Sequence, residues 1–340
     1  MISGRHERRD IEMDGEHIFK LELAIGGRPV RLTVRVPPGP LALVDLLPLA
    51  QGLTDLTVQI ASEAVGTSAR QIRCGPRCGA CCRQLVPISP PEALRLRQTI
   101  EALAPAHRSR VLARFAASAR QLAASGLTAR LRATMAPGTP SAAARRALGL
   151  DYFAQGIACP FLEDESCSIH AERPLACREY LVTSAPQHCA DPAASRAEVV
   201  ELPRRVSIAF AALSAERWRA GMAAAAPPGA DAGADAGADS IADAGAPAGG
   251  HAAAAQVATG WPTWLALIQA LDEQLLDPAA LTADAAATVG LGGAIPPDGA
   301  DLFQDLLQRL TAARPDADAS SEPVAEPDPA AILPADPGLA

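Results

Sequence analysis

The stretch Cys74-Gly-Pro-Arg-Cys78-Gly-Ala-Cys81-Cys82 places four thiols within residues 74–82. The other four cysteines of the 340-residue chain lie within residues 159–189. Packing alone does not require thiols at this density, whereas thiolates select soft metals such as zinc and the iron of iron–sulfur clusters. The pattern therefore predicts a lobe organised around a sulfur-bound metal or cluster.

The compartment bears on how the thiols are used. The first ten residues are charged and lead into no apolar signal segment, and no stretch of about 18 apolar residues is present. We therefore expect a cytoplasmic protein without a membrane span. A disulfide framework does not persist in a reducing cytosol, so metal binding is the preferred interpretation of the cysteines.

Charge is divided unevenly along the chain. Residues 1–222 carry a balance of +7 and residues 223–340 a balance of −15, which gives the net charge of −8. Fourteen arginines fall within residues 70–146, against only Glu92 and Glu101. Such a surface can serve an anionic partner, but cationic helices also offset the negative charge of thiolate-bound metal. Aromatic residues for base stacking are scarce, so nucleic acid is not an expected partner.

Residues 17–36 alternate apolar and polar side chains on both sides of Gly26-Gly27-Arg28-Pro29. The apolar positions are Phe19, Leu21, Leu23, Ile25, Val30, Leu32, Val34 and Val36. This two-residue period around a glycine turn predicts a β-hairpin with one apolar face. A lone hairpin is marginal in water, so we expect a helix starting near Ala42, or a later one over residues 56–65, to cover that face.

Helices are expected after Cys82. Ser89-Pro90-Pro91-Glu92 has the form of a capping box, with Ser89 as the N-cap and Glu92 reaching back to it. A second helix should follow Pro105. The expected inward positions of these two helices are Leu94, Leu96, Ile100, Leu103, Val111, Leu112, Phe115 and Leu122. Further helices are expected over residues 127–135, 141–150, 205–222, 261–276 and 302–310.

Residues 159–189 lack helical periodicity and contain several turn formers, so irregular loops are expected there. Bound metal would supply much of the constraint that orders them. The acidic run at residues 163–165 reads as a solvated turn between two ligands. Residues 223–255, with their Gly-Ala-Asp-Ala repeats, and residues 314–340 have little to bury and are predicted to be disordered.

The cysteine spacing is compatible with two kinds of metal centre, zinc sites and an iron–sulfur cluster. Two tetrahedral four-cysteine zinc sites would use all the thiols. An iron–sulfur cluster needs three closely spaced cysteines and a distant one, for which Cys159, followed by a proline, or Cys177 is a candidate. Adjacent Cys81 and Cys82 point in different directions on a regular backbone. One of these two is therefore expected to serve a second metal or to hold none.

The combined pattern resembles a known family. Besides residues 74–82 it comprises Cys159-Pro-Phe-Leu, Cys167-Ser-Ile-His, Arg173-Pro-Leu-Ala-Cys177-Arg178 and Cys189. These motifs resemble the YkgJ-type cysteine-cluster proteins, a bacterial family with the pattern CxxCxxCC that is described as zinc- or iron-chelating, and whose domain a flagellin lysine N-methylase shares. The resemblance covers about residues 70–190, with one additional residue between Cys74 and Cys78.

The resemblance implies a ligand set but no substrate. It implies that all eight cysteines bind metal: Cys74, Cys78, Cys81, Cys82, Cys159, Cys167, Cys177 and Cys189. From the spacing we expect Cys74, Cys78, Cys81 and Cys177 to converge. His170 and His188 are weaker candidates, for which a role in the loops is preferred. Arg178 is expected to hydrogen-bond a cluster sulfur or to fold back onto Glu179.

The expected fold class is α+β, with an N-terminal β-hairpin, a mainly α-helical body and an irregular cysteine-ligated metal lobe. We divide the chain into a hairpin plus helix (residues 1–69), a cysteine-cluster metal-binding domain (70–222), a disordered low-complexity linker (223–256), C-terminal helices (257–312) and a disordered acidic tail (313–340).

Two classes of function are carried forward. The first is a cytosolic protein that holds an iron–sulfur cluster, expected to be 4Fe-4S, or zinc. If it is an enzyme, it would be an iron–sulfur-dependent oxidoreductase or a protein methylase, which needs an open cluster position or a spare thiolate such as Cys82. The second is a structural zinc module with closed sites that presents an Arg-rich face to a partner protein or nucleic acid.

Overall fold

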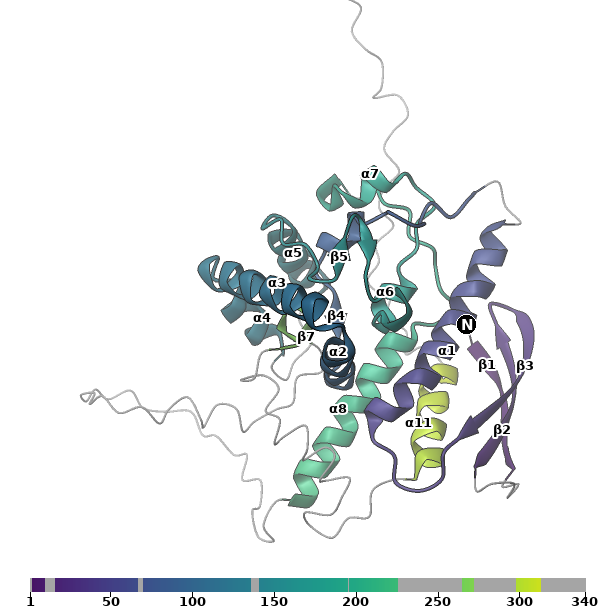
Figure 1. Cartoon of the computed structure of the whole chain (residues 1–340). Helices are drawn as coiled ribbons and strands as arrows, with labels where there is room; N and C mark the ends of the chain where they lie inside the picture. Colours follow the sequence, from purple (N-terminus) through teal and green to yellow (C-terminus); the bar gives the residue numbers. More distant parts are fainter. Residues whose placement is uncertain are drawn as a thin grey trace, which may run out of the picture.

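The computed structural model describes residues 2–9, 16–66, 70–135, 141–194, 196–225, 265–271 and 298–312. A three-stranded sheet lies at one side of the molecule, with the helices α11, α1 and α8 beside it and a second group of helices, α2 to α5, beyond them (Figure 1). Helices segregated to one face of an antiparallel sheet define the α+β class, as the sequence predicts. Within the described residues, no helix is both long enough and apolar enough to cross a bilayer.

The predicted hairpin is present and is extended by one strand. β2 (His17–Ile25) and β3 (Arg28–Val36) pair antiparallel in the register Leu21↔Leu32. Gly26 and Gly27 form the turn with φ values of 61° and 81°, a conformation that glycine adopts without steric cost. β1 (Ile2–Arg9) pairs with the free edge of β2. Its sequence, ISGRHERR, carries no apolar alternation, which is why the pattern does not predict it.

Three helices cover the apolar face of the sheet. α1 (Leu43–Gly66) is a single helix that includes both starting points considered from the sequence. α8 (Val206–Ala225) and α11 (Gly299–Thr311) complete the layer. The rings of Phe19 and Phe303 meet edge to face with centroids 5.0 Å apart, and both are fully buried. This first core therefore joins the N-terminal sheet to a helix nearly 300 residues away.

The docking of α11 depends on Asp298 at its N-cap. Asp298 accepts hydrogen bonds from the backbone N–H of Ala300 (2.8 Å) and, through its other oxygen, from that of Gly39 (3.1 Å). The helix cap is thus shared with the loop that follows β3. A side chain at Gly299 would place its Cβ 2.8 Å from the carbonyl oxygen of Pro37, so the close approach requires glycine.

A second core lies among four further helices. These are α2 (Pro90–Ala102), α3 (Pro105–Ala124), α4 (Leu127–Met135) and α5 (Ala142–Phe153). Most of the predicted inward positions are buried in it: Leu96, Ile100, Val111, Phe115 and Leu122. Leu94 and Leu103 are partly buried, and Leu112 is wrongly predicted, because 42% of its surface is exposed.

The predicted helix over residues 261–276 is wrong for its described part. Residues 265–266 form β7 (Leu265–Ala266), which pairs with β4 (Pro87–Ile88), and a 3₁₀ turn, η5 (Leu267–Gln269), follows. A short, fully buried apolar run has no periodicity that distinguishes a strand from a helix. Pairing with β4 makes residues 265–266 a strand.

The two cores do not coincide with the segments proposed from the sequence, because one proposed segment contributes residues to both cores. Of the segment 257–312, residues 265–271 pack in the second core and α11 packs in the first. α8 continues to Ala225, so residues 223–225 are helical rather than part of the expected linker. The rest of the expected linker, 226–256, and the expected tail, 313–340, lie outside the described residues.

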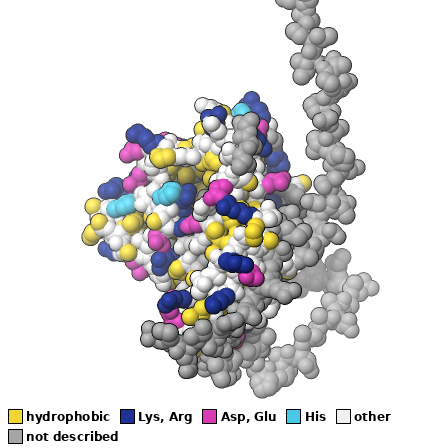
Figure 2. All heavy atoms as spheres, turned by 90° about the vertical axis from the view of Figure 1, so that its right-hand side faces the viewer, with side chains coloured by type: hydrophobic (Ala, Val, Ile, Leu, Met, Phe, Trp, Pro, Cys, Tyr) yellow, Lys and Arg dark blue, Asp and Glu magenta, His cyan; other side chains and the backbone are white. Residues whose placement is uncertain are grey.

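The outer side of the sheet is charged in both signs. Arg31 lies 3.2 Å from Glu22, and Arg35 lies 3.3 Å from Glu16. In the described part of the face in Figure 2, basic and acidic side chains are interspersed. Exposed pairs of this kind contribute little stability each, so burial beneath the sheet dominates.

We expect Phe303→Ala to destabilise the fold by about 3–5 kcal/mol, because it removes a fully buried ring and leaves a cavity against Phe19. Urea unfolding followed by circular dichroism measures this. Gln308→Ala, at an exposed position of the same helix, is the control and should change stability by less than about 0.5 kcal/mol. Equal effects of the two substitutions would show that α11 is not a core element.

Candidate metal centre

The eight cysteines lie on short elements and loops of one lobe. Cys74 and Cys78 are in the loop before the 3₁₀ helix η1 (Ala80–Arg83), which carries Cys81 and Cys82. The second group is placed by three further elements: β6 (Ser166–Cys167), α6 (Leu175–Glu179) and α7 (Pro186–Cys189), with Cys159 in the loop after α5. All eight are free thiols. Cys189 is buried and the others are partly exposed.

Direct hydrogen bonds hold the two cysteine groups together. The backbone N–H of Cys159 donates to the carbonyl oxygen of Cys82 (2.8 Å), and the N–H of Val182 lies 3.4 Å from the sulfur of Cys74. Gln84 donates through Nε2 to the carbonyl oxygen of Cys189 (3.1 Å). Segments about a hundred residues apart in the sequence thus form one site.

One set of neighbouring thiols contains Cys74, Cys78 and Cys189. Burial is the largest cause of the raised pKa of Cys74, and the thiolates of Cys81 and Cys78 raise it further. The pKa of Cys189 is raised by burial and again by Cys81, Cys74 and Cys78, while a hydrogen bond with Tyr180 acts in the opposite direction. The charges of Cys78 and Cys81 therefore raise the pKa of both Cys74 and Cys189.

A second set contains Cys159, Cys167 and Cys177. Burial raises the pKa of Cys159 to about 12, with further increases from the charges of Cys167 and Cys81. Burial also raises the pKa of Cys177 well above its ordinary value, with contributions from Cys159, Cys167 and Cys81. Cys81, whose own pKa is raised first by its hydrogen bond with Cys82 and then by burial, thus neighbours both sets.

This grouping differs from the quartet expected from spacing. The charges that act on Cys177 are those of Cys159, Cys167 and Cys81, whereas Cys189 is influenced by Cys81, Cys74 and Cys78. In the part of the chain that the structure describes, no three or more His, Cys, Asp or Glu side chains already have the arrangement of a formed metal site. The eight-cysteine ligand set therefore stays a prediction.

The chemistry of the donor set fits a soft metal. Crowded, partly buried thiols resist deprotonation because each thiolate loses hydration and repels its neighbours. A bound cation offsets both effects, and thiolates are ligands for zinc and for iron–sulfur clusters. Either group would be held by the thiols of the two sets together with Cys81 or Cys82.

Arg173 is a candidate functional residue to which sequence reasoning assigned no role. Burial is the largest influence on the thiols of Cys74, Cys167 and Cys177 and raises their pKa, while the guanidinium of Arg173 lowers it. Arg173 thus favours the thiolate form in both sets. Its only sequence signal is its position four residues before Cys177 in the motif that carries the family resemblance.

Arg178 does not fold back onto Glu179. Its Nη1 donates to both carboxylate oxygens of Asp55 in α1, at 2.9 and 2.8 Å, and its Nε donates to the carbonyl oxygen of Arg173 (2.9 Å). Hydrogen bonds between two charged groups are stronger than those between neutral groups. Arg178 therefore fastens α6 to the N-terminal layer, which sequence spacing could not indicate.

Two buried carboxylates position α6. Glu92 accepts from the N–H of Ser89 (2.7 Å), as the predicted capping box requires, and its second oxygen accepts from the N–H of Leu175 (2.9 Å). At the other end, Glu179 accepts from the N–H of Ser207 at the start of α8 (2.9 Å). Cys177 is therefore carried by a helix that is held at both ends.

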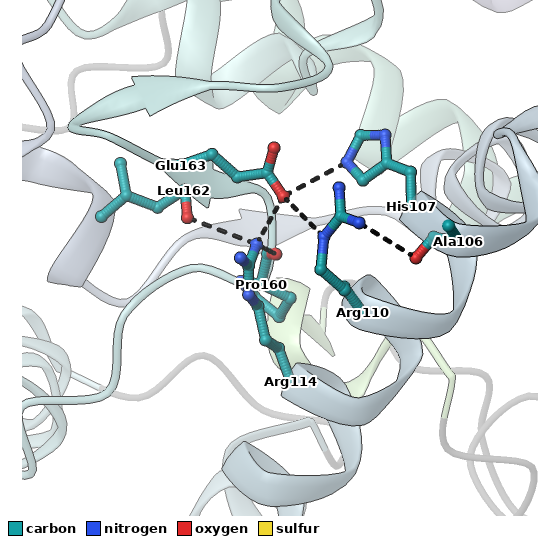
Figure 3. A network of polar contacts seen from close by, with 7 residues as sticks. All are labelled: Ala106, His107, Arg110, Arg114, Pro160, Leu162 and Glu163. Atoms are coloured by element: carbon teal, nitrogen blue, oxygen red, sulfur yellow. Dashed lines mark hydrogen bonds and ion pairs between the residues drawn. The ribbon is translucent and has the colours of Figure 1, made fainter.

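The loop between Cys159 and Cys167 is fastened to α3. Glu163 lies 3.0 Å from Nη1 of Arg114, 3.4 Å from Nε2 of His107 and 4.0 Å from Nε of Arg110 (Figure 3). Arg114 also donates to the carbonyl oxygen of Pro160 (3.1 Å). The acidic run forms the turn expected from the sequence, with Asp164 and Glu165 exposed, but Glu163 is not solvated, because it joins the loop to a helix of the second core.

The tip of the same loop is a tight hairpin against η1. Asp164 and Glu165 both have positive φ, 48° and 58°, between β5 (Leu162–Glu163) and β6. Glu165 accepts from Nη2 of Arg83 (2.6 Å). A Cβ added to Gly79 would lie 2.5 Å from Oε2 of Glu165 and 2.7 Å from Cδ1 of Leu162. A methyl group at residue 79 would also lie 3.3 Å from Cα of Glu165, so both side-chain ends would have to move and the hairpin would be crowded against the first cysteine motif.

The fold and the thiols define a cysteine-rich lobe. Residues 73–194 match the CxxCxxCC family model, described as a putative zinc- or iron-chelating domain, and the match includes all eight cysteines. No curated protein and no solved structure matches the chain. This match confirms the family resemblance stated from the motifs for residues 73–194.

We expect Gly79→Ala to destabilise the lobe by about 1–3 kcal/mol and to lower the metal content per chain, because the new methyl group displaces the side-chain ends of Glu165 and Leu162 and crowds the backbone of the hairpin that carries Cys167. Thermal melting and metal analysis of the purified protein measure both effects. Gly75→Ala is the matched control, since nothing lies within 4 Å of its added Cβ. If Gly75→Ala lowers the metal content as much as Gly79→Ala, the hairpin contact is not what matters.

Glu92 should produce a distinctive pH dependence. Burial raises its pKa from an ordinary value of 4.5, so the folded state binds the proton more tightly than the unfolded state. The tighter proton binding of Glu92 contributes its whole stabilising free energy below pH 4.5. This contribution is lost as the pH rises through the raised pKa of the folded state. The stability difference between the unsubstituted protein and Glu92→Gln should therefore shrink from pH 4.5 to 7.

Urea unfolding at the two pH values tests this expectation. Glu101→Gln, at an exposed position of the same helix, is the control and should leave the pH dependence unchanged. A stability difference for Glu92→Gln that stays constant or grows with pH would show that Glu92 is not bound as a buried acid.

Proposed function

We propose that the lobe holds iron–sulfur clusters of the 4Fe-4S type on two four-thiol sets and serves in redox chemistry or in cluster-dependent modification of a partner protein. One set is Cys74, Cys78 and Cys189, and the other is Cys159, Cys167 and Cys177. Cys81 and Cys82 each complete one set. The observation that carries the proposal is that η1, which holds Cys81 and Cys82, lies against both ends of the second cysteine group: the N–H of Cys159 donates to the carbonyl oxygen of Cys82 (2.8 Å), and Gln84, directly after η1, donates to the carbonyl oxygen of Cys189 (3.1 Å).

Several features favour a redox role over a purely structural one. Electron exchange requires clusters that are close to one another and near the surface, and the two sets meet at η1 while seven of the eight thiols are partly exposed. Arg173 places positive charge near thiols of both sets, and nearby charge is one of the factors that set a cluster's potential. Closed zinc sites that only stabilise a fold need neither feature.

A structural zinc module is the second candidate, because two four-cysteine sets also suit two tetrahedral zinc ions. The accompanying Arg-rich docking face has less support. Arg95, Arg114 and Arg130 form ion pairs within the chain, with Glu172, Glu163 and Asp151. Their charge is thus used in holding helices and loops together, which leaves less of it for a partner protein or a nucleic acid.

Anaerobic purification followed by iron, zinc and acid-labile sulfide analysis and a visible spectrum separates the two candidates. A brown protein with iron and sulfide supports the proposal. A colourless protein whose only metal is zinc contradicts it and favours the structural module.

Paired substitutions test the grouping of the thiols. Cys177→Ser should remove about half of the bound metal, since it disables one of two sets. Adding Cys159→Ser, in the same set, should remove little more. Adding Cys189→Ser instead should remove nearly all, because the other set is then disabled as well. Metal content per folded chain, with folding checked by circular dichroism, gives the answer; the opposite pattern of additivity would contradict the assignment.

A further inference from the structure

An apolar cavity of about 460 Å³ lies between α3, α4 and the η5 turn, apart from the cysteines. Its walls are mainly the side chains of Leu112, Phe115, Leu122, Ile268 and Leu271, with alanines of α3 between them. Small-molecule sites are typically apolar clefts of about 300–1,000 Å³ with a few placed polar groups. In Figure 1, α3 and α4 belong to the helical group on the side away from the sheet.

Leu112 and Gln269 indicate that this cavity is more than a packing defect. Leu112 is one of two large apolar side chains that the described residues expose, and it lies at the cavity wall. Leu112 thus extends the apolar lining of the cavity toward the surface. Gln269, from the opposite wall, is only 5% exposed.

The amide of Gln269 has an unused donor. Its Oε1 accepts a hydrogen bond from the backbone N–H of Ala266 (3.2 Å), which fixes the orientation of the amide because an N–H can pair only with the oxygen. Nε2 is therefore the remaining group, and within the described residues it has no acceptor. A buried donor without a partner costs free energy, which a ligand oxygen in the cavity would recover.

We propose that the cavity binds an amphipathic carboxylate of the fatty-acid type. The hydrocarbon tail lies among the leucines and Phe115, and the carboxylate accepts from Nε2 of Gln269. Arg132 and Thr128 of α4 also line the cavity and supply a positive charge and a hydroxyl group. An acceptor with negative charge matches this set of donors better than an amine or a neutral hydrocarbon does.

The cavity adjoins the metal lobe through one ring. Phe115, in its wall, packs edge to face on Phe161, with centroids 5.5 Å apart, and Phe161 lies two residues after Cys159. Ligand binding can nevertheless be measured without reference to metal, because none of the cavity residues is a cysteine. The proposal therefore stands or falls independently of the metal assignment.

Isothermal titration of the full chain with dodecanoate, below its micelle threshold, tests the proposal. We expect saturable binding that is tighter for dodecanoate than for dodecylamine. Ala119→Trp should weaken dodecanoate binding at least about tenfold, because Ala119 lines the cavity and a large ring there fills it. Ala117→Trp, at an exposed position of the same helix that does not line the cavity, should leave the affinity unchanged.

Gln269→Glu tests the polar end of the site. It keeps an oxygen for the N–H of Ala266 and replaces the donor with an acceptor, so the preference for dodecanoate over dodecylamine should fall by about tenfold or more. Circular dichroism and melting of each variant verify folding. The proposal is overturned if dodecanoate shows no saturable binding, which is also the result expected if another part of the chain fills the cavity. It is equally overturned if Ala119→Trp binds dodecanoate as the unsubstituted protein does.

Discussion

The buried carboxylate of Glu92 is the interaction on which the arrangement of the two cores and the metal lobe depends. It closes the first turn of α2, whose Leu96 packs in the second core, and it accepts from the N–H of Leu175, whose side chain packs in the first core. Burial of such a group is costly unless its oxygens are hydrogen-bonded, and here both are. One carboxylate therefore links both cores at the helix that carries Cys177.

A small number of side chains join the metal lobe to the two cores. Phe161 and Ile169 belong to the second core, Leu175 belongs to the first, and Arg178 reaches Asp55 of α1. These contacts bring the cysteine loops together, although the crowding of their thiols opposes ionisation. The geometry thus comes from packing and hydrogen bonds, while the charge that would let the thiols ionise has to come from a bound cation and from Arg173.

Prediction from the sequence succeeded where a local pattern determines the structure. The alternation in residues 17–36 and the Gly-Gly turn specify the hairpin, and Ser89 with Glu92 specifies the start of α2. Prediction from the sequence failed where a partner that is distant in the sequence determines the secondary structure. β1 carries no apolar alternation and exists because the edge of β2 accepts it. Residues 265–271 are too short and too uniformly apolar to distinguish a strand from a helix without β4.

The candidate site shows the same division. The spacing of the thiols and the flanking motifs identified a zinc- or iron-chelating cysteine domain, because metal chemistry restricts residue type and local spacing. Sequence could not show that Cys189 joins Cys74 and Cys78, or that Glu163 and Arg178 brace the loops. Those relations join residues that are 40 or more positions apart. Local sequence propensity carries no information about contacts between such distant residues. Only the packing of the two cores brings these groups together.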